Sequence, residues 1–152
     1  MEAFLLSVHV VAGILFVGPV AVAVSLFPRY ARIDDSAARP PSSTALDTSV
    51  AWVLHRITRR YGVLTITVPI VGILLAFVQG RLNETWILIA MVLTAIAGGL
   101  LALQIAPRQR EALVSPGSPK RLQQIAMLAG VFNLIWVVVV ILMVIRPGSH
   151  HS

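Results

Sequence analysis

The sequence contains no cysteine, and charged residues are scarce. The lack of cysteine excludes disulfide bonds, thiolate catalysis and zinc ribbons. Only 12% of the 152 residues are charged, whereas a soluble domain carries roughly 25%. Because 57% of the residues are hydrophobic, the composition indicates a membrane protein.

Acidic residues are the rarest charged group, and none lies inside an apolar segment. The three glutamates lie at or beyond the ends of these segments, and the three aspartates lie in a polar stretch between them. A proton relay or a cation transporter would need an acid within the membrane. The sequence also contains no paired carboxylates, no phosphate-binding glycine loop and no nucleophile–base arrangement. We therefore expect a protein that is not an enzyme and has no resident cofactor.

Four apolar segments are long enough to cross a bilayer. Each has at least eighteen residues without Asp, Glu, Lys or Arg, and about twenty helical residues span a hydrocarbon core of ~30 Å. The segments are 3–27, 61–78, 86–106 and 125–145. The sequence therefore predicts one all-α membrane domain over 1–152, a four-transmembrane-helix bundle with loops at 28–60 and 107–124 on one side.

The basic residues are distributed very unequally between the connecting segments. Ten of the twelve lie in 28–60 and 107–124. The positive-inside rule places these segments in the cytoplasm and both termini on the outer face of the plasma membrane. Such residues suit the headgroups of anionic, cardiolipin-like lipids rather than nucleic acid. The predicted lipid-headgroup residues are Arg56, Arg59, Arg60, Arg108, Arg110, Lys120 and Arg121.

Prolines and polar residues suggest where the helices bend and end. Pro28 and Pro107 follow apolar runs and are expected to end them. The stretch 32–48 is rich in residues that favour irregular backbone, so the next helix is expected to begin at Asp47 or Thr48 and to run into the second span.

Two further prolines lie within the apolar segments and predict bends. Pro19 and Pro69 each remove a backbone donor and free the carbonyl four residues earlier, at Leu15 and Thr65.

Small residues recur on the third and fourth spans at a spacing that suits close helix packing. Asn133 follows them and is able to hydrogen-bond to a neighbouring helix. The predicted packing residues are Ala90, Thr94, Gly98 and Ala102 on the third span, and Ala126, Gly130 and Asn133 on the fourth. Packing within the chain is the simpler expectation, and packing against another subunit is the alternative.

His9 is the only ionisable side chain in the first apolar segment. Such residues usually face a protein interior or a cavity. A neutral imidazole there serves as a structural hydrogen-bonding group, or it ligates haem b or copper. At a similar depth the sequence offers Met91 and Met143 as partners, and methionine suits both haem iron and copper(I).

Five stretches of the sequence are recognisable. Residues 130–136 (GVFNLIW) and 142–148 (LMVIRPG), together with 59–62 (RRYG) and 69–72 (PIVG), resemble an uncharacterised four-span integral membrane family of actinobacteria. That resemblance implies the fold and no activity. Residues 8–18 (VHVVAGILFVG) are similar to the first helix of copper-resistance proteins of the CopD type and of HemJ-type protoporphyrinogen oxidases, which implies a cofactor role for His9.

Small four-span proteins of this kind also resemble the accessory subunits of actinobacterial respiratory supercomplexes. Among these is the association factor of the joined cytochrome bc and cytochrome aa3 complexes. This resemblance implies other membrane subunits, those of the respiratory chain, as partners. The leading hypothesis is therefore a non-enzymatic accessory or assembly subunit, and the alternative is a haem- or copper-handling protein that uses His9.

Overall fold

The computed structural model of the chain describes residues 1–32 and 41–148, and every regular element in these ranges is a helix. In chain order the elements are α1 (Glu2–Ala12), the π-helical segment η1 (Gly13–Val17), α2 (Gly18–Tyr30), α3 (Pro41–Leu64), α4 (Thr67–Val78), α5 (Thr85–Leu100), the π-helical segment η2 (Leu101–Ile105), α6 (Ala106–Val114) and α7 (Pro119–Ile145). For the described residues, the all-α prediction is confirmed.

These elements join into four helices that are long and apolar enough to cross a membrane. They cover Glu2–Tyr30, Ser42–Val78, Thr85–Val114 and Pro119–Ile145. At about 1.5 Å per residue, even the shortest exceeds a hydrocarbon core of about 30 Å. The chain is a multi-pass membrane protein, and each helix contains one of the four predicted spans.

The helix that contains the second span begins earlier than predicted. α3 starts at Pro41, so the residues up to Asp47 and Thr48 are helical rather than irregular. The reason is that the first turn of a helix needs no intrahelical donor, which lets a proline begin it. Much of the predicted loop 28–60 is therefore helix, and the predicted polar stretch at 33–40 lies outside the described residues.

Two prolines that were expected to end helices do not end them. α2 continues through Pro28 to Tyr30, and the third long helix continues through Pro107 to Val114. Pro107 lies in the first turn of α6, where its missing N–H costs little. The first part of the predicted loop 107–124 is therefore helical.

The two π-helical segments explain how the helices continue through Pro19 and Pro107. Pro19 follows η1 by two residues, and its ring removes the bond to the carbonyl of Leu15. A π-turn closes its hydrogen bonds over five residues rather than four, so it absorbs the change of register. η2 stands in the same relation to Pro107, two residues before it.

Pro69 is accommodated differently, by a break between α3 and α4. Residues Thr65 and Ile66 interrupt the helix, and Pro69 falls in the first turn of α4. The carbonyl of Thr65 accepts a bond from the backbone N–H of Val68 at 3.0 Å. The carbonyl that the sequence predicts to be free therefore has a partner inside the chain.

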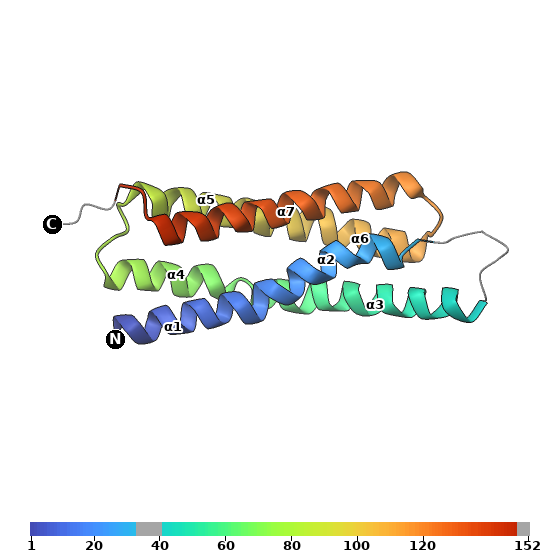
Figure 1. Ribbon diagram of the computed structural model, residues 1–152, viewed down its shortest axis with the longest axis horizontal. Coiled ribbons are helices and arrows are strands. Elements are labelled where there is room, and N and C mark those ends of the chain that lie inside the picture. Colours follow the sequence, from blue (N-terminus) through green and yellow to red (C-terminus); the bar gives the residue numbers. More distant parts are fainter. Residues whose placement is uncertain (33–40, 149–152) are drawn as a thin grey trace.

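The four long helices run side by side, and the start of α1 and the end of α7 lie at one end of the bundle (Figure 1). We call this the terminal end. The opposite end, toward which nine of the eleven described Lys and Arg residues lie, is the basic end. Near the terminal end α1 packs on α4 and α5 packs on α7, while α4 and α5 make few contacts. In the basic half α2 packs on both α3 and α7 and joins the two pairs.

Helix α2 contributes to both buried clusters of the bundle. One lies at mid-bundle and comprises Val20, Val24, Ala97, Leu101, Ile105, Ala129 and Phe132. The other lies toward the basic end and comprises Ala23, Phe27, Ala51, Leu54, Ala112, Leu122 and Ile125. Close packing between the two helix pairs is therefore concentrated in the middle and the basic half.

Candidate functional site

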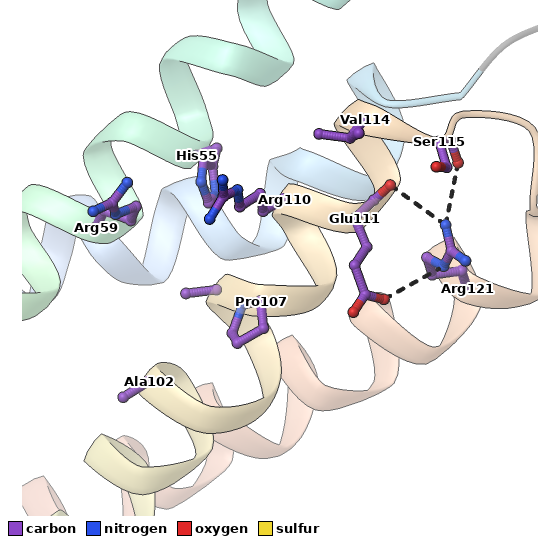
Figure 2. A pocket seen from close by; sticks show the side chains of 10 residues that line it. His55, Arg59, Ala102, Pro107, Arg110, Glu111, Val114, Ser115 and Arg121 are labelled. Carbon is purple, nitrogen blue, oxygen red and sulfur yellow. Dashed lines mark hydrogen bonds and ion pairs between the residues drawn. The ribbon is translucent and has the colours of Figure 1, made fainter.

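A pocket at the basic end brings together residues from α3, η2, α6 and α7 (Figure 2). Its volume is about 650 Å³, and it lies between α3 on one side and η2 and α6 on the other, with α7 at its edge. The lining residues are His55, Arg59, Ala102, Ala106, Pro107, Arg110, Glu111, Val114, Ser115 and Arg121.

Three of the seven predicted lipid-headgroup residues line this pocket. They are Arg59 on α3, Arg110 on α6 and Arg121 on α7. The other four are outside the pocket lining, namely Arg56, Arg60, Arg108 and Lys120. Of these, Arg108 donates a hydrogen bond to the side chain of Gln104 one turn earlier.

The pocket wall includes His55, which the sequence analysis did not single out. Its Nδ1 lies 3.2 Å from the side-chain oxygen of Gln109, whose side chain is fully buried between α3 and α6. The carbonyl oxygen of that amide accepts, so Nδ1 carries the proton. Ala51, Leu54 and Thr58 are buried and share the helix face that carries His55. Their helical spacing is the sequence pattern from which the inward position of His55 could have been inferred.

Arg121 is held in place by the chain itself, as the dashed lines in Figure 2 show. Its guanidinium lies 4.0 Å from the Glu111 carboxylate, and it donates to the carbonyl oxygens of Glu111 and Ser115 at 3.4 and 3.1 Å. Within residues 1–32 and 41–148, Arg59 and Arg110 form no ion pair with a carboxylate. The pocket therefore combines one guanidinium that is paired with a carboxylate and two that form no ion pair with a described acid.

His9 lies in the other half of the bundle and is also buried. Its Nδ1 lies 3.1 Å from the backbone carbonyl oxygen of Val68 on α4, so Nδ1 donates and Nε2 retains its lone pair. The ring rests on Gly72, because a Cβ built there would lie 2.9 Å from Cε1 of His9. His9 therefore makes the hydrogen bond to a neighbouring helix that its structural interpretation expects, and the partner lies on the second span. The role of Met91 or Met143 as a second ligand of haem or copper stays a prediction.

The small residues of the third span are only partly buried. Ala90 lies in the core and Thr94 is half-buried, but Gly98 and Ala102 are exposed. A strict spacing of four drifts by about 40° per step around a helix with 3.6 residues per turn. Over three steps the drift is about 120°, enough to move the stripe from the inside to the outside. Packing within the chain holds for Ala90 and is wrong for Gly98 and Ala102.

The fourth span shows the same division. Ala126 and Gly130 are exposed, and the neighbouring Ala129 is the small residue in the core. Packing within the chain is therefore wrong for Ala126 and Gly130. Asn133 does reach another helix, because its Nδ2 donates to Oγ of Ser25 on α2 at 2.8 Å.

The arrangement offers two kinds of chemistry. The pocket offers guanidinium donors to an anion, and the His9 ring offers a lone pair to a metal or a donor. Among the residues that the structure describes, no group of three or more His, Cys, Asp or Glu side chains is placed to hold a metal ion. No protein-family model, curated protein or solved structure matches the chain.

Proposed function

We propose that this protein is a non-enzymatic accessory or assembly subunit of a membrane protein complex. The observation that carries the proposal is the outward position of the small residues on α5 and α7. A Cβ built on Gly98 or on Gly130 would have no neighbouring atom within 4 Å, and Ala126 is exposed as well. Small residues let helix backbones approach closely. Another subunit is able to use faces that this chain leaves uncovered.

The pairing of the helices supports the same interpretation. Near the terminal end α1 packs on α4 and α5 packs on α7, with few contacts between α4 and α5. Within the chain, α2 makes most of the contacts between these two pairs. A helix from a partner would add further packing between them. The α5–α7 pair also carries the exposed small residues described above.

The partner that we propose is the actinobacterial respiratory supercomplex of joined cytochrome bc and cytochrome aa3. This part of the proposal rests on the resemblance to its small four-span accessory subunits. The proposed orientation follows the positive-inside rule, with the basic end in the cytoplasm and both termini on the outer face of the plasma membrane. The ten basic residues of 28–60 and 107–124 support this orientation.

Bulky substitutions of the exposed small residues on α5 and α7 test the proposal. We expect Gly98→Leu and Gly130→Leu to leave the isolated protein folded and to reduce the respiratory subunits that co-purify with it. Val137→Leu, also on an exposed surface of α7, is the matched control and should leave co-purification unchanged. Deletion of the gene should reduce the amount of intact supercomplex. If deletion leaves every respiratory complex intact, the proposal fails.

A second candidate function is the handling of haem b or copper by His9. The observation that favours it is the bond from Nδ1 to the carbonyl of Val68, since metal-bound histidines usually donate their other ring N–H in this way. An absorbance spectrum and metal analysis of the purified chain test it. A cofactor that is present and is lost in His9→Ala would support the candidate, and a cofactor that persists in this variant would refute it.

A further inference from the structure

The pocket at the basic end has more positive charge than the acids of residues 1–32 and 41–148 neutralise. Glu111 is the acid in its lining, and it faces Arg121. Arg59 and Arg110 both line the pocket together with His55, as Figure 2 shows. They come from α3 and α6, so an anion between them would be contacted from two different helices.

The wall between these two arginines is fixed by buried side chains. His55 is 5% exposed and Gln109 is fully buried, and the bond between them ties α3 to α6. Arg59 lies on α3 and Arg110 on α6, so this hydrogen bond fixes the distance between the two helices that carry them. The pocket is therefore a built feature of the fold rather than a chance cluster of mobile surface charges.

The apolar residues of the lining lie on the same side of the pocket as Arg110. Ala102, Ala106, Pro107 and Val114 lie along η2 and α6, and this apolar wall leads from the basic end toward the middle of the bundle. Figure 2 shows Ala102 and Pro107 on the side of the pocket away from Arg121. A free phosphate gains nothing from such a wall. An anionic lipid does, because its headgroup and its acyl chain need the two kinds of surface side by side.

We propose that this pocket binds the phosphate of an anionic phospholipid, with Arg59 and Arg110 as its ligands and an acyl chain along Ala102 and Ala106. Guanidinium groups bind phosphate oxygens through paired, charge-assisted hydrogen bonds. The ligand chemistry is a phosphate ester, and the apolar wall selects the lipid over a soluble phosphate. This site is independent of the accessory-subunit proposal, since it requires no partner protein.

The test uses the purified full-length chain in a zwitterionic detergent. Cardiolipin, phosphatidylcholine and inorganic phosphate are titrated separately, and binding is followed by the shift in thermal unfolding and by native mass spectrometry. We expect cardiolipin to bind and to raise the unfolding temperature, and the other two to have little effect. The variant Arg59→Gln/Arg110→Gln should weaken cardiolipin binding by at least about tenfold, because each basic residue near anionic lipid strengthens its binding severalfold.

The matched control is Arg29→Gln/Arg32→Gln, which removes the same charge from exposed positions outside the pocket. It should keep cardiolipin binding within about twofold of the wild type. An equal loss in both double variants would overturn the proposal, because binding would then follow net charge alone. Stabilisation by inorganic phosphate as strong as that by cardiolipin would overturn the lipid assignment. The single variant Arg110→Lys keeps the charge and should still bind more weakly, so the proposal stays testable if the double variant fails to fold.

Discussion

His9 and Gly72 are matched across the contact between α1 and α4. The imidazole lies where a Cβ at Gly72 would come within 2.9 Å of its Cε1 and 3.3 Å of its Nδ1. The same Nδ1 donates to the carbonyl of Val68, one turn earlier on α4. The ring is therefore fixed between a hydrogen bond and a bare stretch of helix backbone, and any side chain at Gly72 must displace it.

Gly72→Ala is expected to destabilise the protein by about 1–3 kcal/mol, the usual cost of overfilling a packed contact. The measurement is the free energy of unfolding in detergent micelles. Gly98→Ala is the matched control, because nothing lies within 4 Å of its Cβ position. That substitution should be neutral or should stabilise by up to about 1 kcal/mol, as alanine is the better helix former.

A double-mutant cycle shows whether the penalty comes from the histidine. In a His9→Ala background the ring is gone, so Gly72→Ala should cost little or nothing. Residues in direct contact typically show coupling energies of about 0.5–3 kcal/mol. An equal cost of Gly72→Ala in both backgrounds would contradict the described contact.

The hydrogen bond between Asn133 and Ser25 predicts that substitutions of the two residues destabilise the protein to different extents. Ser25→Ala leaves the Asn133 amide without its partner, and its Oδ1 is already buried without one. Asn133→Leu removes the whole amide, while the Ser25 hydroxyl keeps its bond to the Ala21 carbonyl at 2.7 Å. We expect Ser25→Ala to cost about 0.6–1.7 kcal/mol, as hydrogen bonds between membrane helices do. Asn133→Leu should cost less, and the reverse order of unfolding free energies would be inconsistent with the geometry.

Phe27 tests where the two helix pairs are joined. Its side chain is fully buried in the cluster near the basic end, whereas Phe4 is 71% exposed near the terminal end. Phe27→Ala should cost about 3 kcal/mol, the low end for a buried phenylalanine, since lipid replaces water as the surrounding solvent. Phe4→Ala should change the free energy of unfolding by less than about 0.5 kcal/mol. Similar costs for both variants would contradict the described location of the core.

The four spans could be predicted because a bilayer imposes a simple rule on composition. Each long helix contains a run of eighteen or more residues free of Asp, Glu, Lys and Arg, and that rule needs no knowledge of packing. The helix ends are set by backbone hydrogen bonds, so prolines such as Pro28 and Pro107 were misleading. Two π-helical segments accommodate Pro19 and Pro107, and no sequence rule marks them.

The faces of the helices were harder to predict than their positions. Small residues do recur every four positions from Ala90 to Ala102. Because a helix has 3.6 residues per turn, this row winds through about 120° around the helix, from the core to the surface. The partner of His9 is a backbone carbonyl, which carries no side-chain signal. His55 and Gln109 are 54 residues apart and meet only because α3 and α6 pack together. Composition predicts which segments lie in the membrane, whereas these side-chain contacts depend on how the helices pack together.

Purification of the chain from its native membrane in a mild detergent, followed by mass spectrometry of intact assemblies, tests the central claim most directly. A tagged copy at its natural level of expression is the appropriate form. We predict that most of the chain migrates with a larger assembly at a fixed stoichiometry, and that respiratory subunits are present in it. Recovery of the chain as a stable monomer without partners would contradict the claim that it is an accessory subunit.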